Sequence, residues 1–225
     1  MKKDLEKSYA KGAFEIPLYQ YLSYLGTALS YLALGDSYTI GEAVPQQESF
    51  PFQLVTQLKT SNIPVAKPKV IAKTGWTTDE LQSAIKAENI NQNYDIVTLL
   101  IGVNNQYRGY PQDTYRKEFK ELLQTAIIFA GGNKKRVFVV SIPDWGVTPF
   151  GLSSGKTTKS IADDIDAFNA INKEETLALQ VSYTDITPDS RKAATDLSLV
   201  AKDGLHYSSK MHLQWAQSIP LASIK

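Results

Sequence analysis

The sequence has no cysteine and only two histidines among its 225 residues. The absence of cysteine excludes disulfide bonds, a thiol nucleophile and thiolate metal ligands. His206 and His212 are therefore the only candidates for any histidine-dependent mechanism. Neither sign of charge is in excess, because 24 Lys and Arg face 23 Asp and Glu. Nothing in this balance indicates nucleic acid or an acidic surface as a partner. No apolar run is long enough to predict a membrane span.

Residues 1–30 show the weakest pattern in the chain. Glu15 and Pro17 interrupt their apolar stretch, and no small-residue cleavage site is evident, so a signal peptide is not indicated. We expect an amphipathic N-terminal extension that packs on a single domain over residues 31–225, with a remnant of an export or linker region as the alternative. The sequence leaves a cytoplasmic or periplasmic location, and the oligomeric state, open.

Short apolar runs alternate with amphipathic stretches along the rest of the chain. Strands are predicted at Leu32–Leu34, Val70–Ala72, Tyr94–Ile101, Arg136–Ser141 and Val181–Thr184. Helices are predicted at Phe50–Thr60, Asp79–Glu88, Thr114–Ala130, Ile161–Leu179 and Ser209–Ser218. The alternation predicts an α/β fold with a parallel sheet. The chain length of 225 residues suits one such domain.

The first predicted strand ends abruptly at Gly35-Asp36-Ser37. In open parallel sheets, ligands bind at the carboxyl ends of the strands, so a serine at this turn is well placed to be a nucleophile. The alternative is a serine that only caps the following helix, which is a common arrangement.

A serine nucleophile needs an adjacent base, which in this chain would be one of the two histidines. Asp203 lies three residues before His206, and Gly204 allows a tight turn between them. An aspartate in this place can accept the Nδ1 hydrogen and stabilise the imidazolium that forms during attack. We therefore predict His206 as the base. His212 lies in a helical stretch without an acidic neighbour, and we expect it on the helix surface.

Acyl transfer also needs donors for an oxyanion, and three candidates follow consecutive predicted strands. They are the backbone N–H of Ser37, the backbone at Gly75, and the side-chain amide of Asn104. Taken singly, Gly75 is as well explained as a turn residue and Asn104 as a loop cap. Their shared position at the site-bearing edge of the sheet favours a joint role.

Four short blocks of the chain carry a family resemblance. They are Gly35-Asp36-Ser37-Tyr38, Gly75, Gly102-Val103-Asn104-Asn105 and Asp203-Gly204-Leu205-His206. In order and rough spacing they resemble the blocks of the SGNH, or GDSL-type, hydrolases, over about residues 31–220. The resemblance implies a flavodoxin-like, three-layer α/β/α sandwich with a central parallel sheet of about five strands. It also implies a small-molecule ester as substrate and no metal or organic cofactor.

The same resemblance implies residue roles. Ser37 would attack the ester, with His206 as base and Asp203 as its orienting residue. The Ser37 and Gly75 N–H groups and the Asn104 side chain would form the oxyanion hole. The chain is similar to bacterial members related to lysophospholipase and thioesterase-type esterases, partly through Ser141-Ile-Pro-Asp-Trp-Gly and Asp185-Ile-Thr-Pro.

Two positions depart from the family pattern. Tyr38 stands where the name-giving motif has Leu, and Asn105 stands where many members have Asp. Because the latter residue is outside the triad, we expect altered hydrogen bonding in the loop and retained activity. Asp36, Asn105 and Trp145 are further candidates for contact with the substrate.

A long loop predicted over Pro143–Thr158 contains two motifs that we do not expect to be functional. Gly151-Leu-Ser153-Ser-Gly155 fits the nucleophile elbow G-x-S-x-G, but no strand precedes it. The stretch up to Thr157 imitates a phosphate-binding loop one residue short of the required spacing.

Two alternatives to a lipid or small-acyl esterase stay open at this stage. One is an esterase that removes O-acetyl groups from carbohydrate, and the other is a non-enzymatic small-molecule-binding domain. Aromatic residues in the strand-end loops could face an acyl chain or a sugar, or simply pack in their loops. They are Trp76, Tyr107, Tyr110, Trp145 and Phe150.

Overall fold

A five-stranded parallel sheet lies at the centre of residues 28–220, the part of the chain that the computed structural model describes. The strands are β1 (Tyr31–Gly35), β2 (Lys69–Ala72), β3 (Ile96–Leu100), β4 (Val137–Val140) and β5 (Ser182–Thr184). Their spatial order, β2-β1-β3-β4-β5, is the flavodoxin-like order. The predicted α/β fold is confirmed, and each predicted strand agrees with the structure to within two residues at either end. The predicted N-terminal extension lies outside the described residues, except for residues 28–30.

The central strands β1 and β3 form the middle of the core. Every residue of both strands is buried, as expected for parallel strands that are covered on both faces. The one polar side chain of β3, Thr98, is satisfied by a 2.9 Å hydrogen bond with the Tyr31 hydroxyl. The two strands pair in parallel over their full length, so their carboxyl ends lie at the same edge of the sheet.

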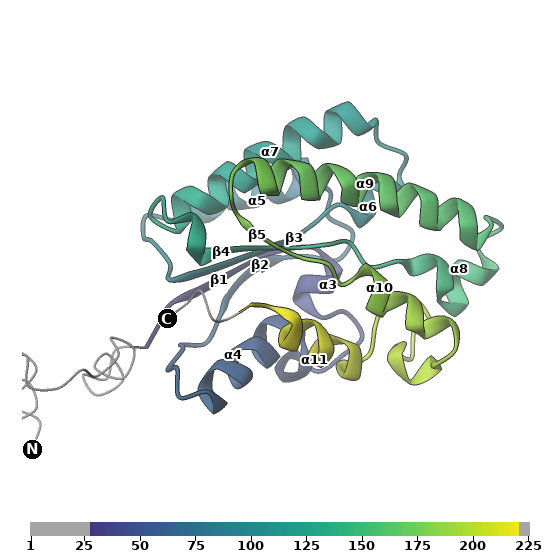
Figure 1. Cartoon of the computed structure of the whole chain (residues 1–225), viewed down its shortest axis with the longest axis horizontal. Coiled ribbons are helices and arrows are strands. Elements are labelled where there is room, and N and C mark those ends of the chain that lie inside the picture. Colours follow the sequence, from purple (N-terminus) through teal and green to yellow (C-terminus); the bar gives the residue numbers. More distant parts are fainter. Residues whose placement is uncertain (1–27, 221–225) are drawn as a thin grey trace, which may run out of the picture.

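Helices cover both faces of this sheet (Figure 1). The helices α5 (Thr78–Glu88), α7 (Gln112–Phe129) and α9 (Thr158–Ala178) lie on one side. The helices α4 (Phe50–Thr60) and α11 (Ser209–Ser218) lie on the other. The predicted three-layer arrangement is therefore confirmed. In the described part of the chain, no helix combines the length and the apolar character that a bilayer crossing needs.

The helix boundaries follow from their caps. The capping box that the sequence predicts at Thr77 and Glu80 is present at the start of α5. The helix α9 begins three residues before the predicted Ile161, because the Thr157 side chain accepts a hydrogen bond from the N–H of Ser160.

The loop predicted over Pro143–Thr158 is wrong in part, because it contains a turn of 3-10 helix, η3 (Trp145–Val147), and a short helix, α8 (Pro149–Ser153). The side chain of Thr148 caps α8 by accepting from the N–H of Gly151, and Pro149 occupies its first turn. Further short helices follow other strands. They are α3 (Ser37–Ile40), α6 (Val103–Tyr107), α10 (Thr187–Ser190), η4 (Arg191–Ala194) and η5 (Leu197–Leu199).

The prediction that His212 lies on a helix surface is wrong, because its side chain is only 1% exposed. The helix α11 packs against α4, and the Nδ1 atom of His212 accepts a 3.1 Å hydrogen bond from the N–H of Phe50 at the start of α4. The ring also packs edge-on against Trp215. Burial, with a smaller contribution from His206, lowers the pKa of His212 to about 3. This histidine is thus a neutral acceptor inside the core.

The depressed pKa of His212 predicts a specific pH dependence of stability. Between the unfolded value of 6.5 and about 3, the unfolded state binds one proton more than the folded state. The contribution of His212 is therefore complete above pH 6.5 and falls by about 1.4 kcal/mol per pH unit as the pH decreases. A His212→Gln variant keeps an acceptor and removes the titration. Urea unfolding at pH 6, 5 and 4 should show its free energy of unfolding rising relative to the wild type by that amount per unit.

The exposed Gln217 of the same helix provides the control. A Gln217→Ala variant should differ from the wild type by the same free energy at every pH. A difference between His212→Gln and the wild type that does not change with pH would contradict the assignment of His212.

Candidate active site

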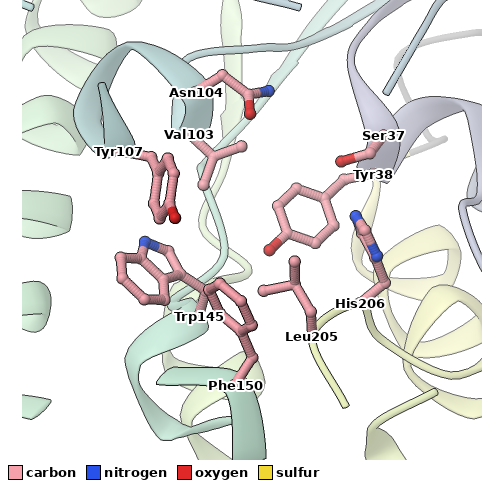
Figure 2. A pocket seen from close by; sticks show the side chains of 9 residues that line it. All are labelled: Ser37, Tyr38, Val103, Asn104, Tyr107, Trp145, Phe150, Leu205 and His206. Carbon is pink, nitrogen blue, oxygen red and sulfur yellow. The ribbon is translucent and has the colours of Figure 1, made fainter. Parts of the chain in front are cut away.

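A pocket of about 180 Å³ opens at the carboxyl edge of the sheet (Figure 2). Its walls come from α3 after β1, from α6 after β3, from η3 and α8 after β4, and from the segment before α11. It is lined by Ser37, Tyr38, Val103, Asn104, Tyr107, Trp145, Phe150, Leu205 and His206. This is the region where open parallel sheets bind their ligands.

The turn at the end of β1 places Ser37 in this pocket. A Cβ at Gly35 would collide with the carbonyl oxygen of Leu100 and with the Thr39 side chain, so only glycine allows this close approach. The Asp36 side chain then caps α3 by accepting a 3.0 Å hydrogen bond from the N–H of Tyr38. Ser37 is the first residue of α3, and its side chain lines the pocket.

His206, which also lines the pocket, forms a close pair with Asp203. Nδ1 of His206 lies 2.6 Å from Oδ2 of Asp203. The other carboxylate oxygen accepts from the backbone N–H groups of Leu205 and His206, each at 3.0 Å. Gly204, with φ of +74°, makes the predicted tight turn between the pair. Partial burial acts to raise the pKa of the Asp203 carboxyl, but the hydrogen bonds from His206 and the backbone outweigh it and hold that pKa below its usual range.

The structure brings Ser37 and His206 together at the pocket, as the sequence predicts. Figure 2 shows the His206 ring beside Ser37, with one ring nitrogen on the serine side. Because Nδ1 contacts Asp203, the other ring nitrogen, Nε2, is free to act as a base. Among the described residues, none forms a hydrogen bond with the Ser37 hydroxyl or with Nε2 of His206. Catalytic hydrogen bonds are often long without substrate and shorten when it binds.

Tyr38, the residue that departs from the family motif, supports the His206 ring. The two rings pack edge-on with their centroids 5.7 Å apart. Tyr38 is buried, and on its other sides it contacts Tyr207 and Trp215. An aromatic side chain in place of leucine therefore ties the histidine to the core packing of α11.

The predicted oxyanion donors lie around this site in different ways. No described residue accepts a hydrogen bond from the backbone N–H of Ser37 or of Gly75. Gly75 has φ of +88° and lies outside the nine lining residues. Asn104 lines the pocket, and its Nδ2 donates to the carbonyl of Trp76 at 2.9 Å. An amide nitrogen carries two hydrogens, so Asn104 retains one donor.

The structure does not place Asp36 and Asn105 in the pocket, which contradicts direct contact with the substrate. Both side chains are fully buried. Burial raises the pKa of Asp36 to about 7. Asn105 accepts from the N–H of Thr78 at 3.1 Å and donates to its hydroxyl at 2.7 Å. Asn105 therefore fixes the start of α5. Its side chain points away from the pocket that Asn104 lines, because neighbouring helix residues face different directions. That these bonds differ from those of family members with Asp at this position stays a prediction.

Trp145 lines the pocket as predicted, and its side chain is held by a hydrogen bond. Its Nε1 donates to the Oε1 atom of Gln106 at 2.9 Å. The rings of Tyr107, Trp145 and Phe150 contact one another, with centroid distances of 5.4 to 6.4 Å. The sequence did not single out Val103 and Leu205, although each directly adjoins a predicted site residue. Trp76 and Tyr110 are not among the lining residues.

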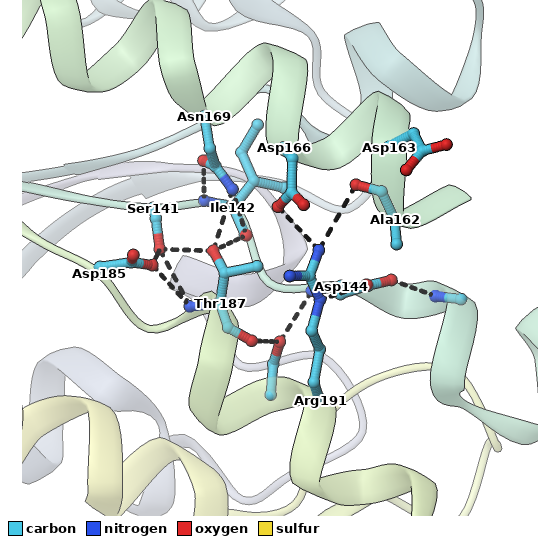
Figure 3. Close-up of polar contacts among 12 residues, drawn as sticks. Ser141, Ile142, Asp144, Ala162, Asp163, Asp166, Asn169, Asp185, Thr187 and Arg191 are labelled. Atoms are coloured by element: carbon cyan, nitrogen blue, oxygen red, sulfur yellow. Dashed lines mark hydrogen bonds and ion pairs between the residues drawn. The ribbon is translucent and has the colours of Figure 1, made fainter. Parts of the chain in front are cut away.

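The segment that carries Trp145 is fixed by a partly buried polar network (Figure 3). Arg191 donates to the fully buried carboxylate of Asp144 at 2.8 Å and to Asp166 at 2.7 Å. The Ser141 hydroxyl bonds to Asp185 at 3.1 Å and accepts from the N–H of Ile186 at 2.8 Å. The stretches that begin at Ser141 and Asp185, which resemble the thioesterase-type esterases, are thus hydrogen-bonded to each other.

The two motifs set aside in the sequence lack the required context. Ser153 lies in α8, is exposed, and donates to the carbonyl of Phe150 at 3.0 Å. Lys156 is exposed in the loop after α8, and no strand leads into it. Within residues 28–220, no cluster of three or more His, Asp or Glu side chains has the arrangement of a metal site.

Comparisons with known proteins agree with this geometry. A family model described as the GDSL-like Lipase/Acylhydrolase family matches residues 33–213. The chain belongs to this family. The resemblance seen in the sequence is thereby confirmed, and the GDSL-family protein is an esterase of the lipase/acylhydrolase type, which leaves the non-enzymatic binding domain without support.

Solved structures share the fold of the GDSL-family chain at low sequence identity. TesA is 13% identical with a TM-score of 0.66, over 87% of this chain and 98% of its own. The esterase EstA from Pseudoalteromonas sp. is 14% identical with a TM-score of 0.63, over 84% and 93%. The acetylxylan esterase Axe2 from Geobacillus stearothermophilus is 17% identical with a TM-score of 0.66, over 87% and 94%. A search of the curated proteins finds no match.

The bond between Asp203 and His206 predicts the effect of an Asp203→Asn substitution. The asparagine oxygen can still accept from the backbone, but its amide group favours the His206 tautomer that carries the proton on Nε2. We expect kcat for p-nitrophenyl acetate to fall by about 10⁴-fold, as the corresponding change does in a serine protease triad. Thermal unfolding should change little.

Asp189 gives a matched control, because it is also paired with a basic neighbour, Lys192, three residues away. Asp189→Asn should keep the wild-type kcat. Full activity of Asp203→Asn would show that this pair does not take part in the reaction.

Proposed function

We propose that this protein hydrolyses carboxylic esters through an acyl-enzyme on Ser37, with His206 as general base and Asp203 orienting it. The observation that carries the proposal is the 2.6 Å contact of Asp203 with His206, whose side chain lines the same pocket as Ser37. An isolated serine is a weak nucleophile, and this pair supplies the base and the orienting carboxylate that it needs.

The residues can perform the reaction in two similar steps. Nε2 of His206 takes the Ser37 proton while Oγ attacks the ester carbonyl, and the ionised Asp203 stabilises the imidazolium. The N–H groups of Ser37 and Gly75 and the free hydrogen of Asn104 stabilise the oxyanion. The proton then passes to the leaving alcohol, and Ser37 carries the acyl group. Water, deprotonated by His206, releases the acid and restores the serine.

The lining of the pocket supports an apolar acyl group of limited size. Apart from Ser37, Asn104 and His206, the wall consists of aromatic and aliphatic side chains. A volume of about 180 Å³ is below the roughly 300–1,000 Å³ of pockets for drug-sized ligands. We infer that the pocket accepts a short or medium acyl chain, from a small ester, a lysophospholipid or another lipid.

A second candidate is an O-acetylesterase that acts on carbohydrate. Tyr107 lines the pocket and is 51% exposed, so its aromatic face is accessible for a sugar to stack on. An acetyl group would also fit the small pocket. The solved structure of an acetylxylan esterase has the same fold, which makes this reaction compatible with the architecture.

The Ser37→Ala variant tests the proposed function. We expect it to lose turnover of p-nitrophenyl acetate and labelling by a fluorophosphonate probe, because the attacking oxygen is absent. Ser153→Ala, in the exposed helix α8, is the control and should retain both. Full activity of Ser37→Ala, or loss of activity in Ser153→Ala alone, would disprove the site assignment.

Shortening the aromatic wall should change the preference for acyl length. In Phe150→Ala, we expect the ratio of kcat/KM for p-nitrophenyl octanoate to that for the acetate to rise about tenfold, because an added methylene in an apolar pocket is worth about 1–3 kcal/mol. Ile128→Ala removes an exposed side chain on α7 and should leave the ratio unchanged. The same change in both variants, or none in Phe150→Ala, would contradict this substrate pocket. Rates with phospholipid and acetyl-sugar esters then separate the two candidates.

A further inference from the structure

Two neighbouring carbonyl groups in the loop after β2 are held from one short helix. Nδ2 of Asn104 donates to the carbonyl of Trp76 at 2.9 Å, and Nη2 of Arg108 donates to the carbonyl of Gly75 at 2.6 Å. Asn104 lies in α6 and Arg108 is its C-terminal cap, four residues later. Side chains at this spacing lie on one face of a helix, so α6 holds two consecutive peptide groups of the loop.

Gly75 needs this restraint more than other residues would. Its φ of +88° lies in the left-handed region, and without a Cβ it moves readily between backbone conformations. Its N–H has no acceptor among the described residues, so no hydrogen bond on that side fixes its direction. The preceding residue is anchored by a hydrogen bond from the Thr74 hydroxyl to Glu42. The contact with Arg108 restrains the following peptide, and together they set where the Gly75 N–H points.

Arg108 is itself held in place by a second contact. Its Nη1 lies 3.4 Å from Oε1 of Glu80. The other oxygen of Glu80 accepts from the N–H of Thr77 at 2.9 Å, which is part of the capping box of α5. The planar guanidinium can serve Gly75 and Glu80 at once through its fixed fork of donors, which the single ammonium of lysine cannot do in the same way.

We propose that Arg108 is a positioning residue that holds the carbonyl of Gly75, and through it the backbone conformation of this residue, so that the Gly75 N–H is aimed at the oxyanion. Arg108 is not among the residues that line the pocket, so it acts through Gly75 and does not touch the substrate. The inference rests on the ester hydrolysis proposed above. It assigns a function to a half-exposed ion pair that would otherwise contribute little to the stability of the fold.

The test compares Arg108→Met and Arg108→Lys with a matched control, Arg116→Met. Arg116 is also partly exposed and pairs with glutamates, Glu174 and Glu175, but it lies on α7 away from the pocket. Acylation and deacylation both pass through an oxyanion. A less well aimed donor therefore slows both steps by a similar factor, which lowers kcat and leaves KM unchanged.

For Arg108→Met, we expect kcat for p-nitrophenyl acetate to fall about 10- to 100-fold, less than the roughly 10²–10³-fold for deleting an oxyanion donor. Arg108→Lys should lie between this variant and the wild type, and Arg116→Met should match the wild type. Rates are expressed per Ser37 labelled by the fluorophosphonate probe, so unfolded protein does not affect the comparison. In a ¹H–¹⁵N spectrum, the Gly75 amide signal should shift or broaden in Arg108→Met.

Several results would overturn the proposal. They are wild-type kcat in Arg108→Met, a raised KM with unchanged kcat, and an equal loss in Arg116→Met. A wild-type protein that neither hydrolyses the ester nor reacts with the probe would overturn the proposed function and this inference together. An active wild type with an unaffected Arg108→Met would overturn the role of Arg108 alone.

Discussion

The close approach of Gly35 to the backbone of β3 is the constraint on which the site depends. Gly35 pairs in register with Leu100, whose carbonyl oxygen occupies the space that a Cβ would need. Because β1 and β3 pair in parallel, the helices α3 and α6 that follow them begin at the same edge of the sheet. Ser37 begins one of these helices and Asn104 lies in the first turn of the other. A larger residue at position 35 would separate the strands and with them the proposed nucleophile and its oxyanion donors.

The pocket combines a polar wall with an apolar one, and each is supported from behind. The His206 ring rests on Tyr38, which packs against Trp215, and Trp215 packs against the buried ring of His212. His212 in turn accepts a hydrogen bond from the backbone N–H of Phe50 at the start of α4. A continuous aromatic layer thus connects the proposed base with the α4–α11 side of the core. Close packing of this kind keeps side chains in single rotamers, which is what preorganised catalytic groups require.

Three carboxyl groups around the site differ in burial and in their hydrogen-bond partners. The buried carboxylate of Asp144 is paired with Arg191 and holds the segment that carries Trp145. Asp36 has no cationic partner among the described residues, and burial raises its pKa to about 7. Asp203 is only partly buried and is stabilised in the ionised form by His206 and two backbone donors. The carboxyl group that the proposed mechanism needs charged thus has three hydrogen-bond partners that favour its ionised form.

The sequence alone determined which residues are candidates for the chemistry and after which strands they follow. Hydrophobic periodicity is a local property, so the five strands and the main helices could be predicted from it, and the Ser37, Asp203 and His206 blocks could be found by motif and spacing. Only the tertiary structure decided which way neighbouring side chains face. Asp36 and Asn105 turn inward although their neighbours line the pocket, and His212 is buried because α11 packs on α4. These directions depend on contacts between segments as far apart as residues 50 and 212, which no local pattern encodes.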